Sequence, residues 1–257
     1  MLLPLQKGIL YGPVHSRRYG RSLGINLMPG RFKLCSFNCI YCHYGWTKTC
    51  TMDVTGHTDE MPAIGEVLAA VEPAVRSNVE FDLITFSGNG EPTLYPGFAE
   101  LVAEVVRLRD LYRPFVSIAL LSNATGLQNQ AVRDCVGRLD LPVFKLDAGT
   151  VETFHRMNRP ADDIEFDELV ELLASIPKIN LQTVMVDGEQ ANTTHAEIQA
   201  YSEKVGRIRP KEVHMYSIDR PTPDTGITLV PPQRLLEIAA QVEDSTGVPV
   251  RTFGARG

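Results

Sequence analysis

The sequence lacks an apolar run long enough to cross a membrane, and its cysteines lack the even number and the spacing that suit a disulfide framework. Its apolar start, MLLPLQKGILYGP, is interrupted by Pro4 and Lys7 and falls well short of the ~18 residues of a membrane span. The five cysteines are an odd number, and three of them lie within eight positions. These absences predict a protein without a membrane segment, located in the cytoplasm, whose reduced thiols are available to bind a metal.

Acidic residues are absent from the first 52 positions, although the whole chain of 257 residues carries a net charge of −6. This segment holds seven basic residues: Lys7, Arg17, Arg18, Arg21, Arg31, Lys33 and Lys48. Such a local excess of positive charge favours thiolates and anionic ligands, but it is also compatible with an ordinary solvated surface. The acidic character of the remaining chain argues against a dedicated nucleic-acid-binding module.

Repeats, low-complexity segments and linkers are also missing, and the chain instead alternates between two kinds of segment. Short runs rich in β-branched and aromatic residues predict strands at 23–27, 81–87, 115–122, 142–147, 179–186 and 212–218. Amphipathic segments predict helices at 61–75, 97–112, 129–139, 166–176, 195–208 and 232–245. Six βα units in one domain over 1–257, with a core at about 20–220, predict an α/β fold of the partial (β/α)6 TIM-type barrel kind. An open doubly wound sheet is the alternative.

Polar residues directly follow each predicted strand. They occur in KLCSFNCIYC after the first strand, SGNGEP (87–92), SNATG (122–126), KLDAG (145–149), the segment from Gln182 to Gly188, and YSIDRPTPD (216–224). The carboxyl ends of parallel strands in such a fold form the ligand-binding edge. The pattern therefore predicts a site there that includes the cysteines.

Cys35, Cys39 and Cys42 form a C-x3-C-x2-C pattern, with Cys50 the next cysteine along the chain. A structural zinc ion requires four ligands, so Cys50 or a histidine would have to complete it. An iron–sulfur cluster with three protein thiolates instead leaves one iron open for another ligand, as a catalytic metal requires. Both interpretations follow from the spacing.

The segment CSFNCIYC resembles the C-x3-C-x-aromatic-C signature of radical S-adenosylmethionine (SAM) enzymes. SGNGEPTL is similar to the Gly-Gly-Glu element of that superfamily, with the departure that Asn89 follows Gly88. GPVHSRRYGRSLGINLMP, KLDAG, RMNRP and DRPTP further resemble the iron–sulfur oxidoreductases that include the wybutosine-type, tRNA-modifying 4-demethylwyosine synthases. The resemblance covers most of the chain.

The resemblance implies that the three cysteines bind a [4Fe–4S] cluster whose fourth iron binds SAM, and that the pair forms a 5′-deoxyadenosyl radical. The SAM-binding residues that it implies are Tyr41, Ser87, Gly88, Asn89, Gly90, Glu91, Ser122, Asn123, Gln182 and Tyr216. Among them, Glu91 is the expected partner of the SAM ammonium group. A flavodoxin- or ferredoxin-type protein is the expected electron donor.

Lys145 and Asp147 lie two residues apart on a predicted strand and therefore point to the same side. An unpaired ammonium group inside the fold is costly, so we predict a Lys145–Asp147 pair, either catalytic or purely structural.

The resemblance leaves the substrate open among a small molecule, a peptide and a tRNA. The wybutosine-type enzymes carry additional cysteines upstream for a second cluster, whereas Cys35 is the first cysteine here, which favours a one-cluster enzyme. Two further functions compete with this reading of the motifs: a glycyl-radical-enzyme activase, and a non-catalytic zinc or electron-transfer protein.

Overall fold

The structure is a computed structural model that describes residues 2–16 and 18–254. The chain forms two compact units. The N-terminal unit comprises residues 5–36 and 48–143, and the C-terminal unit comprises residues 2–4, 37–47 and 144–254. The expectation of a single domain stays a prediction.

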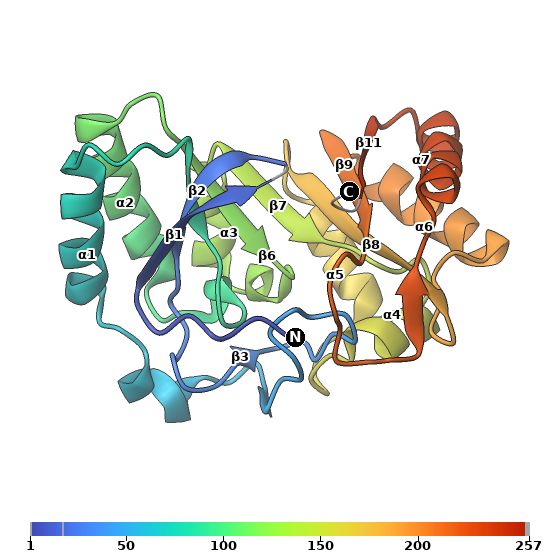
Figure 1. Cartoon of the computed structure of the whole chain (residues 1–257), viewed down its shortest axis with the longest axis horizontal. Coiled ribbons are helices and arrows are strands. Elements are labelled where there is room, and N and C mark those ends of the chain that lie inside the picture. Colours follow the sequence, from blue (N-terminus) through green and yellow to red (C-terminus); the bar gives the residue numbers. More distant parts are fainter. Residues whose placement is uncertain (1, 17, 255–257) are drawn as a thin grey trace. The chain divides into compact units, whose positions relative to one another are not determined.

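The N-terminal unit contains a sheet with the strand order β1-β2-β5-β6 (Figure 1). Its strands are β1 (Leu10–Ser16), β2 (Gly20–Ile25), β5 (Leu83–Phe86) and β6 (Ser117–Ser122). The hairpin β1·β2 is antiparallel, whereas β2·β5 and β5·β6 are parallel. A separate two-stranded sheet pairs β3 (Leu34–Cys35) with β4 (Thr49–Cys50).

Three α-helices belong to this unit: α1 (Ile64–Arg76), α2 (Phe98–Tyr112) and α3 (Gln130–Val136). Three short 3₁₀ helices lie at Thr55–Glu60, Pro92–Leu94 and Thr125–Gln128. All four residues of β5 are buried, as expected for a strand with parallel neighbours on both sides. Helix α2 buries an apolar stripe that includes Leu101 and Val105, which lie four residues apart.

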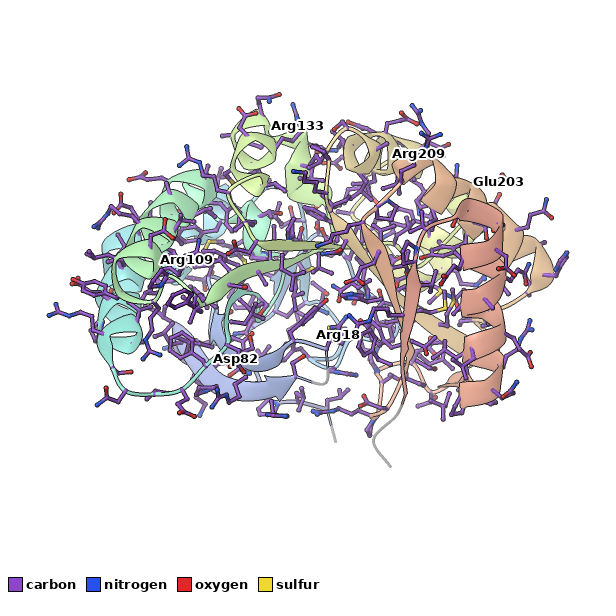
Figure 2. The ribbon with its side chains drawn as sticks, turned by 90° about the horizontal axis from the view of Figure 1, so that it is seen from above. Arg18, Asp82, Arg109, Arg133, Glu203 and Arg209 are labelled. Carbon is purple, nitrogen blue, oxygen red and sulfur yellow. The ribbon has the colours of Figure 1, made fainter. Side chains whose placement is uncertain are left out.

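Arg109, labelled in Figure 2, joins helix α2 to the sheet of the N-terminal unit. Its guanidinium group donates hydrogen bonds to the Val116 carbonyl oxygen at 2.7 Å and to Asp140 Oδ2 at 2.6 Å. Asp140 in turn accepts the amide N–H of Ile118 at 2.8 Å, on the neighbouring strand β6. The contact fixes the end of the helix with charge-assisted hydrogen bonds rather than with apolar packing alone.

Strand β7 (Leu141–Lys145) carries the chain from the N-terminal unit into the C-terminal unit. There β8 (Asn180–Gly188), β9 (Glu212–Ser217) and β11 (Val250–Phe253) pair in parallel, and β10 (Ile227–Leu229) pairs antiparallel with β8. The helices are α4 (Val151–Asn158), α5 (Phe166–Ala174), α6 (His195–Ile208) and α7 (Pro232–Thr246). Within residues 2–16 and 18–254, no helix has both the length and the apolar character needed to span a membrane.

The six predicted strands and the six predicted helices are confirmed, with ends that differ by a few residues. Strands β1, β3, β4, β10 and β11 and helix α4 were not predicted from the sequence. Helix α4 is only eight residues long, and two of its four buried positions, Thr153 and Asn158, are polar, so it has few apolar residues from which a helix could be predicted. Its capping signal was present nevertheless, because the side chain of Thr150 accepts a hydrogen bond from the Thr153 amide.

Candidate active site

Cys35 is the last residue of β3, and its position is fixed by the glycine-rich segment that follows β5. Leu34 forms an isolated parallel bridge with Gly90. The Leu34 amide donates to the Asn89 carbonyl oxygen at 3.1 Å, and the Glu91 amide donates to the Leu34 carbonyl oxygen at 3.3 Å. Cys35 is buried, and its Cα lies in register with that of Cys50 on β4.

Gly90 is required by the close approach of this part of the chain. A Cβ atom at position 90 would lie 1.6 Å from the Leu34 carbonyl oxygen, far inside van der Waals contact. The glycine at this position is therefore explained by the fold itself, because the backbone next to the first cysteine already occupies the space beside Gly90.

We therefore expect Gly90→Ala to displace Leu34 and with it Cys35. The cost in the free energy of unfolding should be about 1–3 kcal/mol, because the clash is with backbone and not with a flexible side chain. Urea unfolding and the iron content after anaerobic reconstitution measure the two effects. Gly137→Ala is the control, since nothing lies within 4 Å of a Cβ built at that glycine. An unchanged stability and iron content in Gly90→Ala would contradict the assignment.

Glu91 is buried at 2% exposure and joins the glycine-rich segment to the end of β6. Its Oε1 accepts hydrogen bonds from the Ser122 hydroxyl at 2.7 Å and from the Thr93 hydroxyl and amide at 2.5 and 3.1 Å. Its Oε2 accepts the Asn123 amide N–H at 2.7 Å. Burial raises the pKa of this carboxyl, while the hydrogen bonds from Asn123, Thr93 and Ser122 oppose that rise. These four bonds give Glu91 a structural role, and its pairing with a SAM ammonium group stays a prediction.

The other predicted SAM-binding residues of the glycine-rich segment also have structural roles within the N-terminal unit. The Ser87 hydroxyl lies 2.5 Å from the Tyr11 hydroxyl. Gly88 has φ +137°, a conformation that favours glycine. The Asn89 amide group donates to the carbonyl oxygens of Gln6 at 2.7 Å and Pro29 at 2.9 Å. Asn89 is fully buried, so its side chain holds two loops together, and a SAM contact by its side chain stays a prediction.

Asn123 connects the end of β6 to Cys35. Its Nδ2 lies 3.7 Å from Cys35 Sγ and donates to the Ser36 hydroxyl at 2.9 Å. Its Oδ1 accepts hydrogen bonds from the backbone N–H and the hydroxyl of Thr125, at 3.1 and 2.8 Å. These two bonds fix the orientation of the Asn123 side-chain amide group. The sequence analysis predicted Asn123 as a SAM-binding residue, and the structure adds a contact with the first cysteine.

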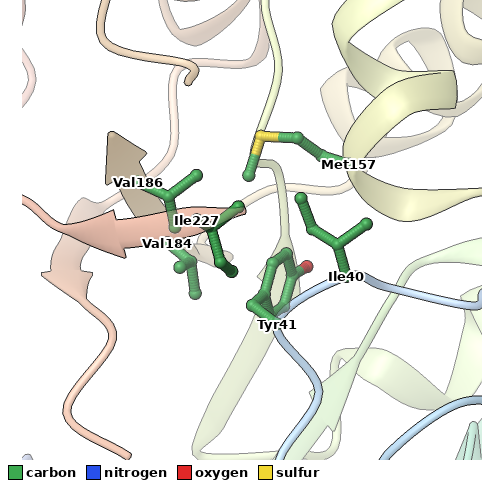
Figure 3. Packing of buried hydrophobic residues seen from close by; sticks show 6 residues of the cluster. All are labelled: Ile40, Tyr41, Met157, Val184, Val186 and Ile227. Atoms are coloured by element: carbon green, nitrogen blue, oxygen red, sulfur yellow. The ribbon is translucent and has the colours of Figure 1, made fainter. Parts of the chain in front are cut away.

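The chain enters the C-terminal unit between Ser36 and Phe37, so Cys39 and Cys42 belong to that unit. The two residues between them are anchored by apolar packing. Figure 3 shows Ile40 and Tyr41 beside Met157 of α4 and Val184 of β8. Ile40 is fully buried, which stabilises this loop by about 1.5–3 kcal/mol.

The C-terminal end of helix α4 holds the cysteine loop through its carbonyl groups. The Ile40 amide donates to the Met157 carbonyl oxygen at 3.0 Å, and the Asn38 amide donates to that of Asn158 at 2.9 Å. The Asn158 side chain lies next to the sulfur of Cys39, with Nδ2 3.5 Å from Sγ. Asn158 is 1% exposed.

Lys145 and Asp147 form the predicted pair, with Nζ 3.6 Å from Oδ1. Asp147 also accepts hydrogen bonds from the Tyr41 hydroxyl, from Asn158 Nδ2 at 2.9 Å and from the Val184 amide at 2.8 Å. Lys145 donates to the Tyr216 hydroxyl at 3.0 Å and faces the rings of Tyr41 and Tyr216 at 4.8 and 5.2 Å. A cation between two aromatic faces is stabilised by their quadrupoles.

These surroundings keep Lys145 charged and Tyr41 neutral. Burial lowers the pKa of Lys145, but the Asp147 carboxylate, the Tyr216 hydroxyl and Cys39 together raise it above the usual 10.5. Burial raises the pKa of Tyr41 well above its usual value, and the neighbouring charge of Asp147 raises it further. At neutral pH the site therefore contains an ammonium group next to the second cysteine.

Gln182, the remaining predicted residue, lies on β8 and is buried. Two buried asparagines were missed by the sequence analysis. Asn158 lies in the quoted motif RMNRP, which was the available signal. Asn192 donates to the carbonyl oxygens of Asp147 and Val184, both at 2.8 Å, and its Oδ1 accepts the Val186 amide at 2.8 Å. It lies in an ordinary polar stretch, QANTT, so nothing in the sequence identified it.

The sequence profile of the Radical SAM superfamily matches residues 31–218. A protein named GTPase Obg in Brachyspira hyodysenteriae is 29% identical over 218 residues, which cover 83% of this chain. The chain spans only 30% of the length of that relative. A UPF0026 protein of Synechocystis sp. is 29% identical over 267 residues, covering 94% of this chain and 95% of that protein.

Solved radical SAM structures share the fold. A radical SAM methyltransferase from Sphaerobacter thermophilus superposes with a TM-score of 0.63 at 17% identity, covering 92% of this chain and 67% of that one. TYW1 with a lysine–pyruvate adduct bound has a TM-score of 0.58 at 15% identity, covering 88% and 75%. Streptococcus suis SuiB bound to S-adenosylmethionine has a TM-score of 0.63 at 13% identity, covering 91% and 50%. The predicted α/β fold of the radical SAM kind is confirmed.

The donor set fits the [4Fe–4S] cluster that this superfamily uses together with SAM. Cysteine thiolates are the usual ligands of such clusters, and hydrogen bonds to their sulfurs help to set the reduction potential of the cluster. Two of the three cysteines here have an asparagine amide beside the sulfur. In residues 2–16 and 18–254, no three His, Cys, Asp or Glu side chains are arranged to hold one metal ion. The thiolates of a cluster bind different irons, so they need not converge on one point.

Proposed function

The chain belongs to the Radical SAM superfamily, and on this premise we propose that Cys35, Cys39 and Cys42 bind a [4Fe–4S] cluster at which SAM is reductively cleaved. The observation that carries the proposal is the amide group placed beside the sulfurs of Cys35 and Cys39, inside the region that matches the superfamily. When bound, the cluster and SAM supply a 5′-deoxyadenosyl radical that removes a hydrogen atom from the substrate.

In the N-terminal unit, the hydrogen-bond network of Glu91 holds the glycine-rich segment and the end of β6 in a fixed arrangement. Both segments carry predicted SAM-binding residues. Because Glu91 is buried and bonded at both oxygens, we propose that it orients these backbones while Asn123 positions Cys35.

In the C-terminal unit, we propose that Lys145 provides a fixed positive charge for an anionic group of the substrate. The Lys145 side chain is mostly buried, but its 12% exposure shows that the protein does not enclose it completely. The solved TYW1 structure contains a lysine–pyruvate adduct. Adduct formation requires a neutral amine, whereas the surroundings of Lys145 raise its pKa. A charged contact therefore suits Lys145 better than a covalent role.

Anaerobic reconstitution tests the proposal. We expect about four irons and four sulfides per chain, and release of 5′-deoxyadenosine after addition of dithionite and SAM. Iron and sulfide analysis and chromatography of the nucleoside products provide the measurements. A preparation that binds only zinc and leaves SAM intact would overturn the proposed function.

Modification of tRNA is the second candidate. It is favoured by the seven basic and no acidic residues of the first 52 positions and by the resemblance of the motifs RMNRP and DRPTP to the wybutosine-type, tRNA-modifying enzymes. If tRNA is the substrate, its addition should increase 5′-deoxyadenosine release, and its binding should weaken steeply with salt.

We also propose a cytoplasmic location and a flavodoxin- or ferredoxin-type electron donor.

A further inference from the structure

The Asn158 amide group lies among three acceptors. Its Nδ2 is 2.9 Å from the Tyr41 hydroxyl oxygen, 2.9 Å from Asp147 Oδ2 and 3.5 Å from Cys39 Sγ. An amide nitrogen carries two hydrogens, so the three acceptors share them. The Tyr41 hydroxyl donates its own hydrogen to Asp147 and therefore receives from Asn158.

Asn158 is held in place by its backbone as well as by its side chain. Asn158 is the last residue of α4 and is 1% exposed. Its backbone carbonyl oxygen accepts the backbone N–H of Asn38, which belongs to the same loop as Cys39. Asn158 is therefore connected to the cysteine loop twice. Its backbone carbonyl oxygen binds the Asn38 N–H, and its side-chain amide group contacts the Cys39 sulfur.

We propose that Asn158 is a positioning residue whose amide donates a hydrogen bond to the Cys39 sulfur and thereby raises the reduction potential of the cluster. This inference depends on the proposed function, because it presumes that Cys39 is a cluster ligand. The role is distinct from SAM binding, since Asn158 acts through the sulfur of a ligand.

The direction follows from charge. Reduction adds one electron to the cluster, and part of the added negative charge resides on the thiolate sulfurs. A nearby N–H stabilises the more negative, reduced form more than the oxidised form, so its removal makes the cluster harder to reduce. Because Asn158 is buried, water does not replace the lost donor.

The N-terminal unit independently repeats the pattern with Asn123 and Cys35. There the distance from Nδ2 to Sγ is 3.7 Å, and the amide also donates to Ser36. The longer distance predicts a smaller effect of the same kind.

The experiment is a potentiometric titration of the reconstituted protein without SAM, followed by electron paramagnetic resonance of the reduced cluster. Asn158→Leu keeps the volume and removes the donor. At the midpoint potential of the wild type, we expect the ratio of reduced to oxidised cluster to drop about tenfold, which corresponds to about 59 mV for one electron. Asn158→Gln retains an amide and should recover part of the drop.

Asn180→Leu is the matched control. Asn180 is a buried asparagine of the same unit, and among the described residues its side chain makes no hydrogen bond to a cysteine. Its midpoint should equal that of the wild type. If Asn158→Leu binds about four irons with an unchanged midpoint, or if Asn180→Leu shifts equally, the inference is wrong. A wild-type protein that forms no [4Fe–4S] cluster would overturn the proposed function instead. If Asn158→Leu fails to fold, the comparison of Asn123→Leu with wild type applies the same criterion.

Discussion

Replacement of Cys39 by alanine is expected to abolish both the [4Fe–4S] cluster and the release of 5′-deoxyadenosine. The same result is expected for Cys35→Ala and Cys42→Ala, because a cluster with three protein ligands has no spare thiolate. The fold should survive, since the loop is anchored by Ile40 and by the carbonyl groups of α4 rather than by the sulfurs. Iron analysis, visible absorption and circular dichroism together measure these outcomes.

Cys135 and Cys50 provide the controls for this prediction. Burial raises the pKa of Cys135 to about 11, and its sulfur donates to the Val132 carbonyl oxygen at 3.2 Å. It therefore remains a thiol inside helix α3, and Cys135→Ala should keep the cluster. Cys50→Ala should also keep it, although Cys50 is the register partner of Cys35. Loss of the cluster in Cys50→Ala would mean that four thiolates bind it and that no iron is left open for SAM.

The sequence was sufficient to predict the features that depend on local pattern. The six βα segments follow from apolar periodicity. The three-cysteine pattern is visible in the spacing, but the spacing alone left a zinc ion and an iron–sulfur cluster both open. The Lys145–Asp147 pair was also predicted, because residues two apart on the predicted strand 142–147 would face the same side and an unpaired buried ammonium is costly; the pair forms although β7 ends at Lys145.

The features that could not be predicted depend on contacts between distant segments. Asn158 lies 119 positions from Cys39, and nothing in its immediate surroundings shows that its amide faces a sulfur. Likewise, two of the four hydrogen bonds that Glu91 accepts come from residues 31 and 32 positions away, which a motif match does not reveal. Gly90 shows the same limitation, because the atom that excludes a side chain there belongs to Leu34.

The second large effect is expected at Asp147, whose replacement by alanine should destabilise the C-terminal unit far more than Lys145→Met does. Asp147 accepts hydrogen bonds from Tyr41, Asn158 and the Val184 amide, so Asp147→Ala leaves these donors and the Lys145 ammonium without their acceptor. Removing one partner of a buried ion pair costs about 3–5 kcal/mol. Lys145→Met also removes one partner, but the three hydrogen-bond donors still stabilise the Asp147 carboxylate, so it should cost less, about 1 kcal/mol.

This asymmetry separates a purely structural ion pair from one whose lysine is retained for function. Urea unfolding at pH 7 measures both free energies, and equal costs would favour the structural interpretation.

The pH dependence offers an independent check. A lysine whose folded pKa lies above 10.5 stabilises the fold fully below pH 10.5, and this contribution is lost as the pH rises through the folded value. The raised pKa of Tyr41 also changes the free energy of unfolding in the alkaline range. The contribution of the lysine is therefore measured as the difference in this free energy between wild type and Lys145→Met. That difference should be constant up to about pH 10 and shrink above it; a difference that is lost near neutral pH would contradict the assignment of Lys145 as a permanent cation.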